Sequence, residues 1–445
     1  MMEPLSRLGR TLASAAIAGA LAAPAAAQAP RFALTMAEAA TAARAHALDV
    51  RAASEDSASA RSDAEAAFAP LLPRLTLDGG YRYQAEVPAF AAAAGAPPRP
   101  FGSHRATSVG PTLSWTLWDD GALRKTWRAR QASARSQEER ERLFSAQATQ
   151  AARLAYVQVQ LAREKARLLA EAVAVADAQY ADIEGRRRAG AASRIDSLSS
   201  HQADLQRRKD FLSAQADLAC ALRELFQLTG LGAGLDLTRP MDLSLELDSL
   251  ADVPAELAAV EASSGPRVDH PGALAYARQA DSARLSADAE SAGAWPRIQF
   301  QGAVAYEYPN GPALESVTQK SAGLTASLPL FEGRESARRA EKHRHLAAAA
   351  QRRRELVVEQ FARDWDRARA ELAALRGQAA LDATAVVEAE ELARLVHLSY
   401  QGGRSTFLEV QTYDLAALRA KVNAAQTRAQ ILIHLATLAQ LSTPG

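Results

Sequence analysis

The chain contains 445 residues, 23% of them charged and only 6% aromatic, with alanine runs throughout. The 52 basic residues nearly balance the 51 acidic ones, for a net charge of +1, so no basic excess indicates a nucleic-acid partner. The single cysteine, Cys220, excludes an intramolecular disulfide framework and a cysteine-cluster metal site. With few bulky side chains, the composition favours long helices packed along seams over a thick conventional core.

The N-terminus has the pattern of a secretory signal peptide. Arg7 and Arg10 precede an apolar stretch over residues 11–23, and Ala25-Ala26-Ala27 forms a small-residue cleavage site, so we expect residues 1–27 to be removed on export. The apolar stretch is shorter than the ~20 residues that a membrane-spanning helix needs, and no apolar run of that length follows. If the mature chain lies in a membrane, it must do so as a closed β-barrel.

Three short segments occur twice in the same order: residues 73–79 and 296–302, 117–121 and 330–333, and 189–190 and 402–403. Their spacings are 223, 212 and 213 residues, so the length difference is confined to one interval, as a surface loop tolerates. Ordered matches at nearly constant spacing indicate an internal duplication. We expect a first repeat over residues 28–230, a connecting segment over 231–265 and a second repeat over 266–445.

Each repeat is expected to form a helix, two strands, a very long helix, a turn and a return helix. Residues 121–189 contain no proline, and the apolar positions that recur there at steps of three, four and seven are Leu154, Val157, Leu161, Leu168 and Val175. This heptad spacing is typical of helices packed in a coiled seam. Helices of about 65 residues are about 100 Å long. The second long helix is expected over residues 333–400, and the return helices over 192–228 and 404–440.

Four segments alternate between apolar and polar residues: about 74–84, 107–118, 297–308 and 321–331. We expect one face of the sheet to carry Leu75, Leu77, Tyr81, Leu113, Trp115, Leu117, Ile298, Phe300, Val304, Leu324, Leu328 and Leu330. Lipid-facing barrel strands and a half-buried sheet of a soluble protein both show this alternation. Four strands are too few to enclose a water-filled lumen, and lipid forbids open sheet edges. In a membrane, several subunits must therefore share one barrel.

Two kinds of segment, taken in order, resemble the outer-membrane efflux proteins typified by TolC. The strand-to-helix junctions Leu117-Trp118-Asp119-Asp120-Gly121 and Leu328-Pro329-Leu330-Phe331-Glu332-Gly333 look like the P-L-F-D-G-G junction of that family. The C-terminal run over residues 399–410 looks like its helix turn, Y-x-x-G-x-x-x-x-x-[DE]-V. The resemblance covers about residues 32–441, nearly the whole mature chain.

The resemblance implies a mainly helical fold with a membrane β-barrel. Each protomer of a homotrimer would give four strands to a 12-stranded barrel, and the long helices would form an α-helical barrel in the periplasm. Residues 231–265 would belong to an equatorial belt around that tunnel. The implied function is a passive channel in the outer membrane of a Gram-negative bacterium. Such a channel serves a tripartite efflux pump or a type I secretion system, with a periplasmic adaptor and an inner-membrane transporter as partners.

No pattern of catalytic or cofactor-binding residues is visible. The chain has no nucleotide-binding loop, no H-E-x-x-H metal motif and no G-x-S-x-G nucleophile motif, so we expect neither an enzyme nor a cofactor. His343 and His345 are two residues apart and would point to different faces of a helix, so no metal site is expected there. The cargo is not indicated, since specificity would lie with the inner-membrane partner.

The helix turns are the positions most relevant to function, because a periplasmic tunnel would narrow there. By resemblance, Glu409 matches the first acidic position of an entrance ring, whereas Thr412 stands where the family has a second acid. Arg404 lies near a position where the family can hold a basic residue, and Asp196 is the first-repeat counterpart of Glu409. Three such carboxylates around a pore would favour cations. The alternative is that Glu409 and Asp196 only support the start of each return helix.

The tips of the two turns are the expected docking surface for a periplasmic adaptor, by analogy with the family. The residues concerned are Gly190, Ala191, Ser193, Gly402, Gly403 and Ser405. The competing class of protein is an exported soluble helical adaptor or structural spacer, whose strands would form a small packed domain. Adaptors usually carry a lipoyl-like β-domain between two hairpin helices, and no such pattern is visible.

Overall fold

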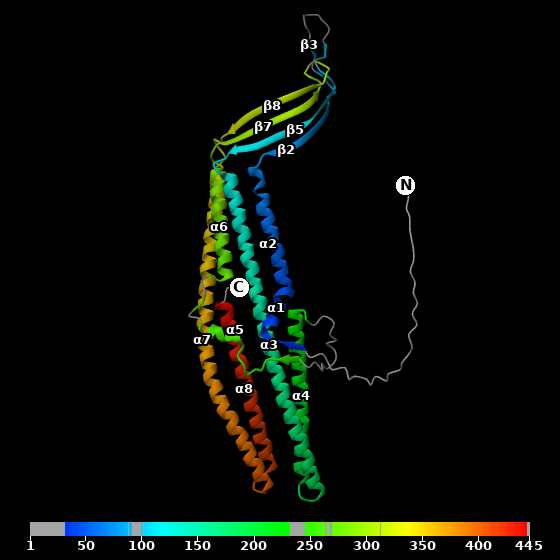
Figure 1. Cartoon of the computed structure of the whole chain (residues 1–445), viewed down its shortest axis with the longest axis vertical. Helices are drawn as coiled ribbons and strands as arrows, with labels where there is room; N and C mark the ends of the chain where they lie inside the picture. The colour runs from blue at the N-terminus through cyan, green and yellow to red at the C-terminus, as the bar shows by residue number, and fades with distance from the viewer. Residues whose placement is uncertain are drawn as a thin grey trace, which may run out of the picture.

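The computed structural model shows a long helical rod with a curved β-sheet at one end (Figure 1). The predicted signal peptide, together with residues 232–244 and 263–264 of the predicted connecting segment, lies outside the residues that the structure describes. The described residues are 32–87, 89–90, 99–100, 102–231, 245–262, 265–266, 269–311 and 313–442. Among the helices of these residues, none combines the length and the apolar character that crossing a bilayer requires.

The two halves of the chain contain the same elements in the same order. In the first half these are α2 (Leu48–Ala66), β2 (Arg74–Tyr83), β5 (Arg105–Trp118), α3 (Ala122–Arg188) and α4 (Arg194–Thr229). In the second half they are α6 (Pro271–Ala292), β7 (Arg297–Tyr308), β8 (Val317–Ser327), α7 (Glu335–Gln401) and α8 (Phe407–Ser442). Because α3 and α7 contain 67 residues each and α4 and α8 contain 36 each, the duplication extends to the length of every long helix.

The spacing between the repeats is constant from the start of the long helices onward. Both ends of α3 and α4 are matched 213 residues later by the ends of α7 and α8. The strand-to-helix junctions follow the same spacing, because Asp120 and Gly121 have positive φ, as do Gly333 and Arg334. Gly121 therefore corresponds to Arg334, and the spacing of 212 inferred from the two glycines is wrong by one residue. The extra residues of the first repeat lie between its strands, where residues 84–104 replace the shorter connection 309–316.

The four long strands form one antiparallel sheet in the order β2-β5-β7-β8, so β2 and β8 are its edges. The strand expected over 321–331 instead covers Val317–Ser327, and Leu328 and Leu330 lie beyond its end. Pro329 has no N–H to donate and restricts the residue before it, which ends the ladder there. A β-bulge between Thr116 and Trp118 makes Leu117 an extra residue, so Trp118 and not Leu117 pairs with Ile298.

The helices pack in two levels along the rod. Near the sheet, α2 and α6 pack against α3, and α6 also packs against α7; farther away, α4 packs on α3 and α8 packs on α7 (Figure 1). The seam of α3 is built largely from alanines, including Ala152, Ala155 and Ala162, which let the helices approach closely. Of the predicted heptad positions, Val157 and Leu168 are buried, whereas Val175 is 50% exposed.

A small layer covers the middle of the rod. It contains β1 (Phe32–Leu34), which pairs in parallel with β6 (Leu245–Leu247), together with α1 (Met36–His46) and α5 (Ala255–Ala258). Tyr156 of α3 is fully buried beneath this layer. Its hydroxyl donates to the Leu34 carbonyl oxygen at 2.8 Å and accepts from the Asp248 N–H at 3.1 Å. The largest apolar core surrounds this contact and includes Leu225, Trp365, Leu432 and Leu435.

Candidate functional site

Two turns join the long helices to their return helices, at the end of the rod farthest from the sheet (Figure 1). In each turn a glycine adopts the left-handed conformation, with φ of 77° at Gly190 and 72° at Gly403. The next residue closes the helix end, since the Ala191 N–H donates to the Arg186 carbonyl oxygen at 2.8 Å and the Arg404 N–H donates to that of Ser399 at 2.9 Å. Left-handed backbone costs glycine little, which explains the glycine in both repeats.

Both predicted gate carboxylates belong to capping boxes at the start of the return helices. Asp196 accepts hydrogen bonds from the Ser193 N–H at 3.3 Å and hydroxyl at 2.7 Å, and its own N–H donates to that hydroxyl oxygen at 3.1 Å. Glu409 accepts from the Thr406 N–H at 2.7 Å, and its N–H donates to the Thr406 hydroxyl oxygen at 3.3 Å. The two acids therefore stabilise helix starts in the same way.

The other residues predicted at the second turn differ in their surroundings. Arg404 and Thr412 are exposed, and the Thr412 hydroxyl donates back to the Leu408 carbonyl oxygen at 2.8 Å. Ser405 is half-buried, and its hydroxyl donates to the Ser399 hydroxyl at 2.9 Å. Ser405 therefore contributes to the internal structure of the turn more than to its surface.

The two turns touch through a small apolar cluster that links the repeats. It contains Ile183, Phe407 and Val410, all buried, with Val396 and Tyr400 packed against them. The Tyr400 ring lies 5.9 Å from the Phe407 ring, and the Arg186 guanidinium lies 5.7 Å from the Tyr400 ring centre. Burial raises the pKa of the Tyr400 hydroxyl, so it stays protonated at neutral pH. The α3–α4 tip is thereby held against the α7–α8 tip.

Glu184 is a feature of the first turn that sequence reasoning missed. Its carboxylate accepts two hydrogen bonds from Arg187, at 2.9 and 2.7 Å, and one from the Ser197 hydroxyl at 2.8 Å. These bonds, led by those from Arg187, lower the pKa of Glu184 to about 2. Arg188 also donates to it, at 3.4 Å. The spacing of three and four residues between Glu184 and these arginines was the available sequence signal.

The predicted adaptor-docking residues lie mostly on the surface of the tips. Gly190, Ala191, Ser193, Gly402 and Gly403 are exposed. Next to them, the sequence places an apolar side chain at the same position in each repeat, and both are exposed: Ile195 by 76% and Leu408 by 70%. The two tips therefore present similar surfaces, each with one exposed apolar side chain beside small residues.

At the opposite end, the strand register brings predicted apolar residues together on one face of the sheet. Leu75 pairs with Leu113, and Trp115 pairs with Phe300, which in turn pairs with Leu324. Among the predicted apolar residues, those at least 40% exposed are Leu75, Leu77, Tyr81, Trp115, Leu117, Val304 and Leu324 within the strands, and Leu328 and Leu330 beyond the end of β8. An exposed apolar face of this extent is unusual for the surface of a water-soluble monomer.

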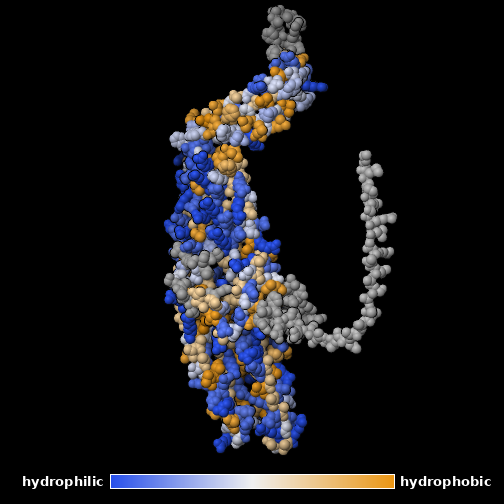
Figure 2. Space-filling model, in the orientation of Figure 1, coloured by the Kyte–Doolittle hydropathy of each residue, from blue (hydrophilic) through white to orange (hydrophobic). Residues whose placement is uncertain are grey.

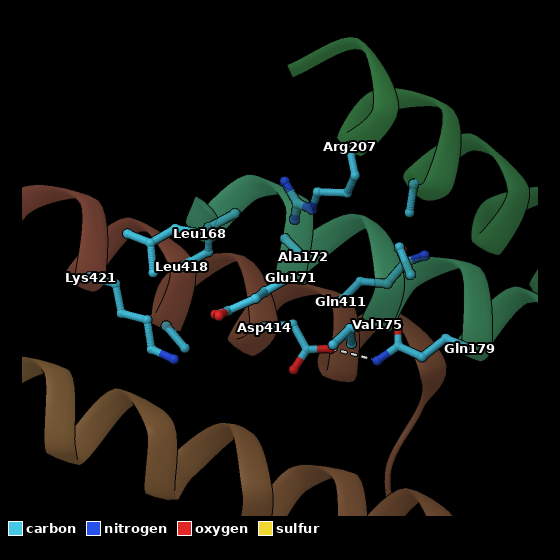
Figure 3. Close-up of a pocket in the computed structure, with 13 residues that line it drawn as sticks. Leu168, Glu171, Ala172, Val175, Gln179, Arg207, Gln411, Asp414, Leu418 and Lys421 are labelled. Carbon is cyan, nitrogen blue, oxygen red and sulfur yellow. Dashed lines mark hydrogen bonds between the residues drawn. The ribbon is translucent and has the colours of Figure 1, made fainter. Parts of the chain in front are cut away.

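A hollow of about 240 Å³ lies between α3, α4 and α8 (Figure 3). Its apolar lining includes Val175, which explains why that heptad position is not buried. The charged groups around it have partners, since Asp414 accepts from Gln179 at 2.7 Å and Lys421 forms an ion pair with Glu390 at 2.5 Å. We assign no ligand to this hollow. In the part of the chain that the structure describes, no three His, Cys, Asp or Glu side chains are grouped to hold a metal ion.

Comparison with known proteins agrees with this architecture. Residues 39–231 match the model of the outer membrane efflux protein family. No curated protein sequence matches the chain significantly.

Solved structures match over nearly the whole chain. The outer membrane protein VceC of Vibrio cholerae has a TM-score of 0.75 at 16% identity, covering 92% of this chain and 96% of VceC. A membrane protein of Pseudomonas aeruginosa has a TM-score of 0.74 at 18% identity, covering 91% and 93%. The MtrE outer membrane channel of Neisseria gonorrhoeae has a TM-score of 0.71 at 17% identity, covering 91% and 88%. The first half of the chain thus resembles outer membrane efflux proteins in sequence, and the chain as a whole shares the fold of these solved outer membrane channels.

Proposed function

We propose that the chain is one protomer of a homotrimeric export duct in the outer membrane. The observation that best supports this proposal is a four-stranded sheet at the end of a helical rod, with an exposed apolar face and two unpaired edges, β2 and β8. Hydrocarbon does not tolerate unpaired backbone groups, so β8 of one copy would pair with β2 of the next. Three copies would close a 12-stranded barrel wide enough for a lumen. The helices, about 100 Å long, would continue the duct into the periplasm.

The duct would be passive and would act with two partners. The sequence has no nucleotide-binding loop, so energy would come from an inner-membrane transporter. A periplasmic adaptor would dock on the tips, where Ile195 and Leu408 offer apolar contacts beside small residues. The assembly would be a tripartite efflux pump or a type I secretion system.

Extraction tests the membrane assignment directly. We expect the protein to stay with outer membranes through a high-salt wash, to require detergent, and to have three times the mass of one chain in native mass spectrometry. Release by salt alone as a monomer would instead support a soluble periplasmic adaptor or spacer.

For the gate, we propose that Glu409, and to a lesser extent Asp196, place negative charge around the narrow end of the duct. Glutamine can replace glutamate in a capping box, so Glu409→Gln removes the charge but keeps the cap. We expect this variant to reduce cation selectivity of single channels in planar bilayers. Thr406→Ala is the matched control, because it weakens the cap and keeps the charge. Unchanged selectivity in Glu409→Gln would leave Glu409 with a capping role only.

A further inference from the structure

A second hollow, of about 500 Å³, lies between α3 and α6 in the half of the rod next to the sheet. Its lining is dominated by arginines: Arg128 and Arg135 come from α3, and Arg278 and Arg284 come from α6. Asp281 is its one acidic residue. Figure 2 shows this half of the rod as the most hydrophilic part of the visible surface. Four guanidinium groups gathered from two helices form a concentrated site of positive charge.

The positive charge in this hollow is mostly uncompensated. The Asp281 carboxylate is shared, at 3.9 Å from Arg278 and 3.6 Å from Arg284. Arg284 also donates to the Gln351 side-chain oxygen at 2.8 Å. Arg128 and Arg135 are exposed and form no ion pair with any residue that the structure describes. With four positive charges and one negative charge, the lining has a net charge of +3.

The arginines lie on the outer side of the proposed duct. Arg128 and Arg135 precede Tyr156 by four and three heptads, so they share its face of α3 in a helix packed with heptad spacing. Tyr156 contacts Leu34 and Asp248 of the layer around β1 and β6, which would surround the tunnel. The hollow therefore opens between that layer and the membrane. This placement rests on the proposed function.

We propose that this hollow binds a phosphate-type oxyanion. The planar fork of an arginine side chain matches phosphate oxygens in a bidentate way, and two helices present such forks toward one space. Arg128 lies six residues into α3, about 9 Å along its axis. The polar layer of a bilayer extends roughly 5–8 Å beyond the hydrocarbon, so Arg128 stands just outside that layer and is the arginine of the hollow nearest to the anionic lipid headgroups of the periplasmic leaflet. Free phosphate in the periplasm has the same chemistry.

The test compares both sources of phosphate on the full-length protein in neutral detergent. Native mass spectrometry measures binding of phosphatidylglycerol, with phosphatidylcholine as the uncharged-headgroup comparison. Isothermal titration calorimetry measures binding of inorganic phosphate at constant ionic strength. The hollow variant is Arg128→Gln with Arg135→Gln. Its matched control is Arg367→Gln with Arg394→Gln, which removes the same charge from exposed positions on α7 outside the hollow.

We expect the hollow variant to lose affinity about tenfold or more and the control pair to stay within about twofold of the natural protein. Selective binding of phosphatidylglycerol alone identifies the headgroup as the ligand, and binding of inorganic phosphate identifies a free oxyanion. The proposal is overturned if the natural protein binds neither, if the hollow variant binds as tightly as the natural protein, or if both variants lose affinity equally.

Single-channel recording of the same proteins separates this inference from the proposed function. Normal conductance of the hollow variant shows that it folds and assembles, so a failure to bind phosphate then removes only the anion site. If the natural protein forms no channel, the duct proposal fails, while calorimetry with inorganic phosphate still decides whether the hollow binds an oxyanion.

Discussion

Removing the hydroxyl of Tyr156 should loosen the layer around β1 and β6 from the rod. Burial raises the pKa of this hydroxyl well above its ordinary value, so at neutral pH it keeps its proton and donates to the Leu34 carbonyl. Tyr156→Phe leaves that carbonyl and the Asp248 N–H without their partner. Leu34 is buried, so leaving its carbonyl unsatisfied costs about 1–3 kcal/mol, whereas Asp248 is exposed and its N–H can bind water instead. If this cost destabilises the closed layer relative to its locally opened state, the opened state becomes roughly 5- to 150-fold more populated.

Native-state hydrogen exchange measures this opening at the amides of β1 and β6. We expect faster exchange in Tyr156→Phe at these strands, with the tips of the rod unchanged. Tyr180→Phe is the matched control, because it makes the same chemical change on the same helix, where the Tyr180 ring packs at a tilt against the His201 ring. The reasoning is refuted if β1 and β6 exchange at the natural rate in Tyr156→Phe, or if Tyr180→Phe accelerates them equally.

Three further predictions concern the turns and helix ends. Because the pKa of Glu184 is lowered, its hydrogen bonds stabilise the α3–α4 turn below pH 4.5 and are lost only as the pH falls toward 2. Hydrogen exchange of the amides at this turn should therefore speed up as the pH falls toward 2, and Glu184→Gln should abolish this acid dependence. Burial lowers the pKa of His270, whose Nδ1 accepts from the Gly272 N–H at 3.2 Å, so protonation below about pH 6.5 should loosen the start of α6. His270→Asn keeps a hydrogen-bond acceptor that does not titrate, so hydrogen exchange at the start of α6 should be slower at pH 5 in this variant than in the natural protein. Gly403→Ala places a side chain on left-handed backbone, and the resulting strain of about 1 kcal/mol should speed proteolysis of this turn. Gly185→Ala replaces a glycine inside α3 with a better helix former and should slow proteolysis near the end of α3.

The regular features of the fold were predictable because they depend on local chemistry. The absence of proline over residues 122–188 permits a 67-residue helix, and the alternation in the strands sets which side chains share a face. Gly190 and Gly403 mark the turns because left-handed backbone favours glycine. The capping role of Glu409 followed from its place after the turn, although only the structure shows that the box is complete.

Features that depend on three-dimensional register could not be predicted. Arg334 has the left-handed backbone conformation that Gly121 has in the first repeat. Aligning the two glycines, Gly121 and Gly333, therefore misplaced the strand-to-helix junction of the second repeat by one residue. The bulge at Leu117 and the early end of β8 depend on pairing with neighbouring strands. The arginines of the second hollow come from α3 and α6, which are too far apart in the sequence for a local pattern to show that they meet.

The equal lengths of the two helical hairpins constrain how this chain can change over evolutionary time. One residue added to α3 alone would advance its tip by 1.5 Å and rotate it by about 100°, which would carry Arg186 off the Tyr400 ring. The same addition in α7 would restore the match. Insertions and deletions in one long helix are therefore tolerable only when the other long helix acquires a change of the same size.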